Sequence, residues 1–80
     1  MRIQLNFVAL EAYDFPGKDK ESLDLANGAN VVDALHALGL EEDTFYLTLQ
    51  NDTSVPKTLR SKTELKEGDV LTLFYPIKGG

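Results

Sequence analysis

The sequence predicts an α+β fold in which one main helix packs across a mixed sheet of four or five strands. Three observations predict it. Residues 2–10 alternate between apolar and polar side chains, which is the period of a half-buried strand. Residues 31–38 carry one amphipathic stripe, and residues 70–74 form an almost continuous apolar run typical of a central strand. A chain of 80 residues has room for one such sheet and helix around a single core.

The first two strands are predicted to pair as a hairpin. Every second residue of 2–10 is apolar, and residues 22–26 repeat this pattern over a shorter stretch. Residues 14–18 contain proline next to glycine, which favours a turn because proline presets one backbone dihedral and glycine permits another. The connection is therefore longer than a tight turn.

The predicted helix has clear start and end signals. Asn30 is a good N-cap, and Asp33 lies near the positive end of the helix dipole. Gly39 can adopt the left-handed conformation that ends a helix, and Leu40 can make the accompanying apolar contact. Four residues at spacing i, i+3, i+4 and i+7 form the apolar stripe: Val31, Ala34, Leu35 and Leu38.

The second half of the chain is predicted to supply the remaining strands. Residues 45–49 alternate as a third strand, and residues 55–59 form a short edge strand in which Pro56 limits the ladder. Gly68 is expected to take a positive φ in the turn before residues 70–74. The first and last strands are the most apolar, which places them side by side in the middle of the sheet. This is the β-grasp, or ubiquitin-like, arrangement.

Composition narrows the classes of function. The net charge of −5 disfavours nucleic acid and anionic membranes as partners, because both need a basic surface. The chain has no cysteine, which excludes a disulfide framework, a thiolate zinc site and a cysteine nucleophile. No apolar run approaches the roughly 18 residues of a membrane span, and the N-terminus does not resemble a signal peptide. We therefore expect a cytoplasmic protein whose partners are proteins.

Candidate catalytic and metal-binding groups are few. The single histidine, His36, would need Ser22, Ser54 or Ser61 for a catalytic triad, and no spacing supports one. A place on the helix flank near the negative end of the dipole is the simpler interpretation. Residues 41–43 are acidic but lack calcium-loop spacing, so a solvated loop is expected and no metal. The chain is not expected to be an enzyme alone.

Basic residues gather in one short segment. Four of them fall within ten residues: Lys57, Arg60, Lys62 and Lys66. Glu64 and Glu67 interrupt the segment, so a solvated surface is the simpler interpretation and a docking patch the alternative.

The last residues form a candidate functional tail. Pro76 cannot donate to a sheet ladder, so strand pairing is expected to lapse there. We predict one domain over residues 1–80 with a flexible tail at 76–80, which when extended reaches at most roughly 17 Å. Gly79 and Gly80 lack side chains, so this end could enter a narrow tunnel and present a carboxylate to another protein.

Two segments resemble the MoaD/ThiS family of ubiquitin-like sulfur carriers. Residues 65–69 resemble the family's leucine, spacer and Gly-Asp turn before the last strand. Residues 71–80 resemble the MoaD ending of strand, aromatic residue, proline, two residues and Gly-Gly, and residues 31–35 fit the family's helix start. Tyr75 stands where MoaD tails usually have a first proline, and residues 55–57 look more like ThiS. The longer first hairpin is more like MoaD.

The resemblance implies that the carboxylate of Gly80 is adenylated by an E1-like enzyme of the MoeB or ThiF type, which uses ATP and magnesium. A sulfurtransferase persulfide then supplies sulfur, and the product is a thiocarboxylate. The acceptor would be a MoaE-type synthase in molybdopterin synthesis, which we favour, or a thiazole synthase in thiamin synthesis. The carrier itself would hold no permanent cofactor and would act as the small subunit of a synthase.

The resemblance also implies a role for each residue of the tail. Gly80 bears the sulfur, and the residues that thread into the partner are Pro76, Ile77, Lys78 and Gly79. Phe74 and Tyr75 would contact the partner at the root of the tail. Two alternatives remain: a ubiquitin-like modifier joined to protein lysines through Gly80, and a β-grasp binding module whose Gly-Gly is incidental.

Overall fold

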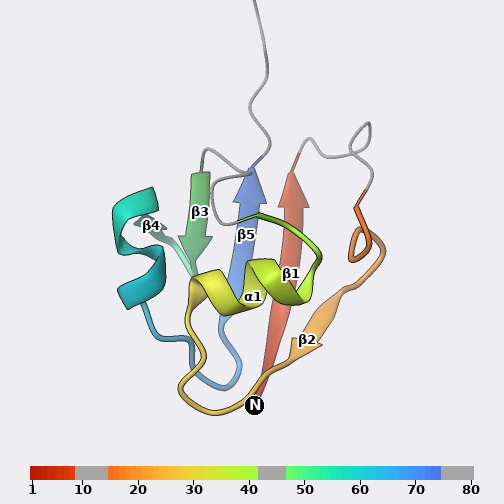
Figure 1. Ribbon diagram of the computed structural model, residues 1–80, viewed down its shortest axis with the longest axis horizontal. Helices are drawn as coiled ribbons and strands as arrows, with labels where there is room; N and C mark the ends of the chain where they lie inside the picture. The colour runs from red at the N-terminus through yellow and green to blue at the C-terminus, as the bar shows by residue number, and fades with distance from the viewer. Residues whose placement is uncertain (9–14, 42–46, 75–80) are drawn as a thin grey trace, which may run out of the picture.

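The computed structural model describes residues 1–8, 15–41 and 47–74. Figure 1 shows one α-helix crossing one face of a mixed sheet. The elements in chain order are β1 (Arg2–Val8), β2 (Ser22–Asp24), α1 (Val31–Ala37), β3 (Leu47–Gln50), β4 (Thr53–Val55), the 3₁₀-helix η1 (Lys57–Lys62) and β5 (Val70–Phe74). The α+β prediction is confirmed.

The sheet has the strand order β2-β1-β5-β3-β4. β1 and β5 are parallel neighbours in its centre, and the other three pairs are antiparallel. The predicted placement of the first and last strands is therefore confirmed. Two parallel strands need a crossover connection, and here the crossover includes α1, which covers the sheet.

The core lies between α1 and the facing side of the sheet. The helix stripe contributes four buried residues, namely Val31, Ala34, Leu35 and Leu38, and the central strands contribute Ile3, Leu71 and Leu73. Burying each of these larger side chains contributes about 1.5–3 kcal/mol to folding relative to exposure. The predicted apolar faces of the helix and of β1 are both confirmed.

The ends of α1 follow the sequence signals. The side chain of Asn30 accepts a hydrogen bond from the Asp33 amide at 2.9 Å, and the carboxylate of Asp33 accepts one from the Asn30 amide at 2.9 Å. This reciprocal pair is a capping box in which aspartate replaces the usual glutamate. At the other end Gly39 has φ +79°, and the Leu40 amide donates to the Leu35 carbonyl at 2.9 Å.

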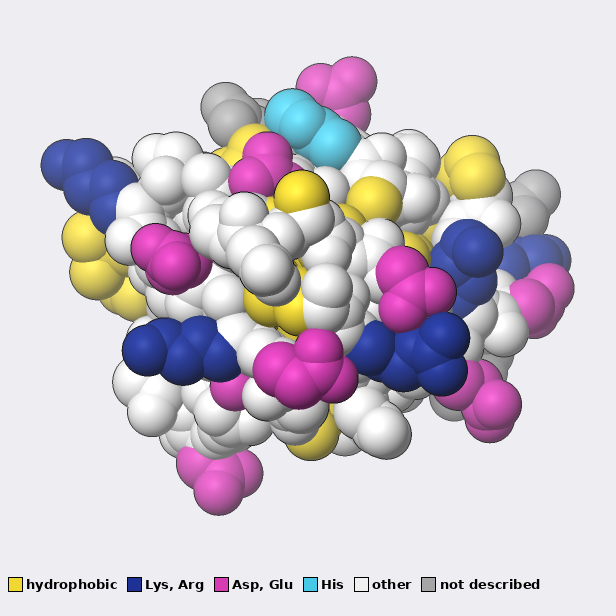
Figure 2. Space-filling view, turned by 90° about the horizontal axis from the view of Figure 1, so that it is seen from below, with side chains coloured by type: hydrophobic (Ala, Val, Ile, Leu, Met, Phe, Trp, Pro, Cys, Tyr) yellow, Lys and Arg dark blue, Asp and Glu magenta, His cyan; other side chains and the backbone are white. Residues whose placement is uncertain are grey.

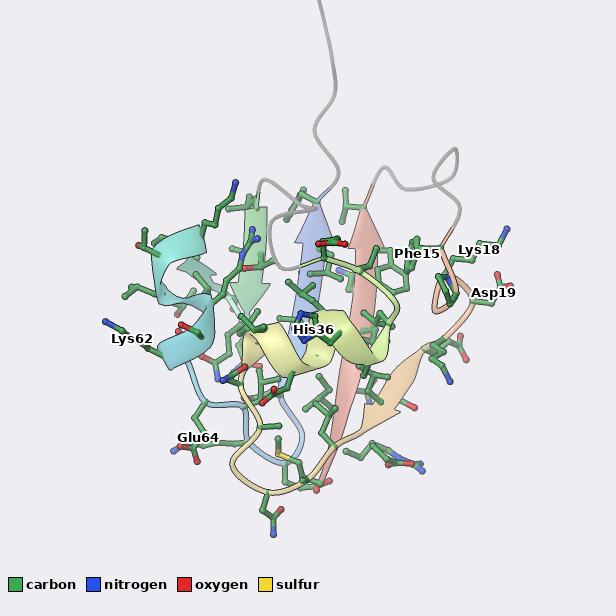
Figure 3. The ribbon with its side chains drawn as sticks, viewed as in Figure 1. Phe15, Lys18, Asp19, His36, Lys62 and Glu64 are labelled. Carbon is green, nitrogen blue, oxygen red and sulfur yellow. The ribbon has the colours of Figure 1, made fainter. Side chains whose placement is uncertain are left out.

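The turn at residues 16–19, in the connection between β1 and β2, is anchored on the C-terminal end of α1. The Gly17 amide donates to the Leu38 carbonyl at 3.0 Å, and a Cβ on Gly17 would lie 2.4 Å from Leu38 Cδ2. Phe15 is buried and packs edge-on against Phe7 with ring centroids 5.4 Å apart. Lys18, on the same turn, points outward (Figure 3).

The predicted edge strand over residues 55–59 is wrong in its extent. The strand β4 lies at residues 53–55 instead, and Pro56 follows it as the N-cap residue of η1. Proline has no amide to donate to a ladder, so pairing stops there and the next residues coil into a 3₁₀-helix. Other predicted strands begin or end a few residues away from the observed bounds, and residues 9, 10, 45 and 46 lie outside the described part of the chain.

Candidate functional site

β5 carries the chain to the predicted functional tail. It ends at Phe74, at the upper edge of the sheet in Figure 1, between β1 and β3. Phe74 is half-buried. The other residues assigned to the tail and its root lie outside the described residues, namely Tyr75, Pro76, Ile77, Lys78, Gly79 and Gly80. The structure therefore fixes where β5, the strand that precedes the predicted tail, ends.

The start of β5 is set by the Gly-Asp turn. Gly68 has φ +84°, as predicted, and its amide donates to the Arg2 carbonyl at 2.9 Å. A Cβ at this position would meet no atom within 4 Å, so glycine is favoured here by the backbone conformation alone. The turn thereby ties the beginning of β5 to the beginning of β1.

The carboxylate of Asp69 holds this turn together. Oδ2 accepts hydrogen bonds from the Lys66 amide and from Gln50 Nε2, both at 2.8 Å, and Oδ1 accepts from Asn51 Nδ2 at 3.2 Å. Burial acts to raise the pKa of Asp69, but the hydrogen bonds from Gln50, Lys66 and Asn51 together with the Lys66 charge outweigh it. The pKa is therefore lowered from its ordinary value of 3.8.

This network predicts a specific loss of stability in acid. A carboxyl group with a depressed folded pKa stabilises the fold fully above its unfolded pKa, near 3.8, and loses that contribution as the pH falls through the folded value. Asp69→Asn should lower the free energy of unfolding by about 1–3 kcal/mol at pH 7, because an amide group cannot accept all three donors. Urea unfolding at pH 7 and at pH 2–3 should show this difference shrinking in acid. An equal difference at both pH values would contradict the role of the ionised carboxylate.

The sheet face opposite α1 carries an apolar row beside the root of the tail. Leu71 and Leu73 point to the core, so Val70, Thr72 and Phe74 occupy the other face of β5. Phe74 is paired with Val8 of β1 and with Leu47 of β3. These three side chains form a row across three strands, which we call the tail-root row. Leu47 is 36% exposed, so the row is accessible to a partner.

Apart from Arg2 at one corner, this open face is uncharged over its central strands. Its residues, by pairing register, are Gln4, Asn6 and Val8 of β1, Val70, Thr72 and Phe74 of β5, Leu47 and Leu49 of β3, and Ser54 of β4. In a chain with 26% charged residues, this stretch of sheet has none. Depletion of charge with aromatic enrichment is typical of the centre of a protein–protein interface. The one ion pair of this face, Arg2 with Asp24 at 2.9 Å, lies at its far corner.

The alternative catalytic and metal candidates can be placed only in part, because Glu42 and Asp43 of the acidic loop lie outside the described residues. His36 is exposed in the last turn of α1, where a cation favours the helix dipole, as the sequence suggested. Ser22 and Ser54 lie on the two edge strands, on the sheet face opposite α1, so neither is placed to form a triad with His36. Among the residues that the structure describes, no group of acidic and histidine side chains could hold a metal ion. No helix within residues 1–8, 15–41 and 47–74 is long and apolar enough to cross a membrane.

The basic segment separates into exposed and buried members. Lys57 and Lys62 are exposed on η1, and Lys66 is exposed before the last turn. Arg60 is only 1% exposed and packs inward, which sequence reasoning missed because charged side chains are rarely fully buried. The open face was also missed, since it emerges only when three strands are brought into register.

Comparison with known proteins identifies the class. The ThiS family model matches residues 8–80, and the chain belongs to this family. It is a ubiquitin-like protein of the sulfur-carrier class, which generally works with E1-like activating enzymes. The crystal structure of SAMP1 from Haloferax volcanii is similar with a TM-score of 0.72 and 24% identity over 100% of both chains, which shows the shared fold. The search of curated proteins found no match.

Proposed function

We propose that this protein is a sulfur carrier that works through the carboxylate of Gly80. Membership of the ThiS family is the observation that carries the proposal. The geometry supports it, because β5 ends beside an accessible, uncharged surface that leads directly to the tail.

The proposed chemistry has two stages. In the first, an oxygen of the Gly80 carboxylate attacks the α-phosphorus of ATP, pyrophosphate leaves, and an acyl-adenylate forms in the E1-like enzyme with magnesium. In the second, the terminal sulfur of a protein persulfide attacks the acyl carbon and AMP leaves. A thiol then reduces the resulting acyl disulfide, which leaves a thiocarboxylate on Gly80 and a disulfide on the donor side.

The fold limits where these steps can occur. Five extended residues from Pro76 to Gly80 reach at most roughly 17 Å, so the enzyme that activates Gly80 must approach the end of β5. Phe74, which is half-buried in the tail-root row, is then placed to contact that enzyme. Tyr75, the next residue, is proposed to extend this contact, and residues 76–79 to thread into the active site. Docking on this row would position the tail before the chemistry begins.

The proposed acceptor pathway is molybdopterin synthesis with a MoaE-type synthase. The MoaD-like ending of residues 71–80 and the long connection between Val8 and Ser22 support this choice over thiazole synthesis. The experiment supplies the thiocarboxylate form to a purified MoaE-type synthase with the pterin precursor, and in parallel to a thiazole synthase. Conversion of the pterin precursor alone is expected. Sulfur transfer only to thiazole would move the protein to the thiamin pathway, and conjugates to lysine in place of either would identify a modifier.

A further inference from the structure

Residues 53–63 form an acid-free segment on one edge of the sheet. The segment comprises β4 and η1 and contains three basic residues, namely Lys57, Arg60 and Lys62, whereas the whole chain has a net charge of −5. Asp52 and Glu64 flank it on either side. A local excess of positive charge on an acidic protein is a feature that the proposed chemistry at Gly80 does not use.

The 3₁₀-helix η1 is held in place on the rest of the fold. The Leu59 amide donates to the Pro56 carbonyl at 2.8 Å, and Asn30 Nδ2 donates to the Ser61 carbonyl at 3.0 Å. The buried side chain of Arg60 anchors its inner side. Thr63 directly follows η1, and its carbonyl accepts a hydrogen bond from the Val31 amide at 3.1 Å. The exposed groups on η1 are therefore presented from a fixed backbone.

The outer side of η1 combines an apolar and a cationic group. A 3₁₀-helix has three residues per turn, so Leu59 and Lys62 lie one above the other. Leu59 is 46% exposed, and Lys62 points away from α1 (Figure 3). Figure 2, seen from below, shows Lys or Arg side chains beside hydrophobic ones at the left edge, on the side of η1, whereas both signs alternate across the middle.

The two exposed lysines of η1, Lys57 and Lys62, lack an ion-pair partner among the described residues. No nearby carboxylate in the described part of the chain cancels the positive charge of such lysines, so their electrostatic field extends into the solvent. A positive field of this kind accelerates association with an acidic surface. The edge is also continuous with the open face, because Ser54 of β4 is paired with Leu49 of β3.

We propose that η1 docks on an acidic surface of the E1-like activating enzyme through Leu59 and Lys62 on its outer side and through Lys57, its exposed first residue. An apolar pocket rimmed by carboxylates would receive Leu59 and pair with the lysines. This inference rests on the proposed function. The activating enzyme is chosen because activation of Gly80 is the first step for a carrier and for a modifier alike, and because an acidic partner surface complements exposed lysines on a chain whose net charge is −5.

The test compares two charge-reversed variants of the full chain with a purified E1-like enzyme. Lys57→Glu/Lys62→Glu alters η1, and Lys18→Glu/Lys20→Glu makes the same change in net charge on the opposite edge. ATP–pyrophosphate exchange gives kcat and KM, and calorimetric titration without ATP gives Kd. Gly79–Gly80-deleted protein is titrated as well, because it retains η1 but cannot be adenylated.

The Lys57→Glu/Lys62→Glu variant is expected to have a KM and a Kd at least about tenfold higher than wild type, with kcat unchanged. Added salt should weaken the binding of wild-type protein more than it weakens the binding of this variant. Leu59→Ala should also raise KM, whereas the Lys18/Lys20 variant should change it less than about twofold. Equal values for the two charge-reversed variants would overturn the docking proposal. Binding of wild-type protein without pyrophosphate exchange would instead refute the proposed function while leaving η1 docking supported.

Discussion

Deletion of Gly80 is expected to abolish sulfur transfer completely while leaving the fold intact. The deletion removes the carboxylate that is proposed to be adenylated and shortens a tail that begins only after β5 ends at Phe74. The described core lies within residues 3–73, so loss of the last residue should not change the unfolding midpoint. The measurement is transfer of labelled sulfur to the acceptor synthase, with thermal unfolding as the parallel readout of stability.

A milder variant keeps the reacting carboxylate and tests whether the partner's site has room only for glycine. Gly80→Ala keeps a terminal carboxylate but adds a Cβ, which a tunnel shaped for glycine cannot accept. Transfer should fall by a factor of about 100 or more, since a small misplacement at a reacting atom has effects of that size. Lys20→Ala is the control, because it removes an exposed side chain outside the tail and leaves the Gly-Gly end unchanged. Normal transfer by the Gly80-deleted protein would rule out the mechanism.

Truncation of the tail-root row is expected to have the second largest effect. Phe74→Ala/Leu47→Ala removes the aromatic and aliphatic contacts that flank the start of the tail on β5 and β3. Buried aromatic anchors dominate interface energies, so KM for adenylation should rise about 10–100-fold. The value of kcat should change little, because Gly80 and its chemistry are untouched.

The control for this effect lies on the same face. Val70 is 37% exposed and stands at the other end of β5, so Val70→Ala removes apolar area from the open face far from the tail. Its KM should stay within about threefold of wild type. Because Phe74 is half-buried, urea unfolding must confirm that the double variant is folded at the assay temperature. Equal effects of the two variants would contradict a docking site centred on the tail root.

Much of the fold could be predicted because local signals agreed with the overall arrangement. Asn30 and Gly39 delimit α1 through hydrogen bonds between near neighbours, which a sequence displays directly. The positive φ of Gly68 followed from its turn in the same way. The apolar runs of the first and last strands predicted that they lie side by side in the middle of the sheet, because strands covered by a helix carry many apolar residues; their parallel orientation comes from the structure.

The remaining features depend on distant residues and could not be predicted. Residues 57–62 were expected partly as a strand, but Pro56 ends the ladder and the anchoring of Ser61 by Asn30 holds a 3₁₀-helix instead. The burial of Arg60 likewise depends on how η1 packs against α1. The tail-root row requires the registers of β1, β5 and β3 together, so no single segment reveals it.

The reacting group of the candidate site could be predicted from the sequence, whereas the surface on which a partner could dock required the structure. Gly79 and Gly80 were singled out by their residue type and by the resemblance to sulfur carriers, and their role remains a prediction. Phe74 was assigned to partner contact, and the structure places it in an uncharged row that suits this role without testing it. The sequence favours a solvated surface for the basic segment, whereas the exposure of Lys57 and Lys62 on η1, which also exposes Leu59, suggests a docking site.

The most direct test is intact mass spectrometry after incubation with the E1-like enzyme, ATP, magnesium, a persulfide donor and a thiol reductant. The account predicts a mass gain equal to the exchange of one oxygen for one sulfur, located on Gly80 and absent from the Gly80-deleted protein. An unchanged mass under conditions in which the same enzyme activates its known carrier would contradict the claim that this protein carries sulfur on its C-terminal glycine.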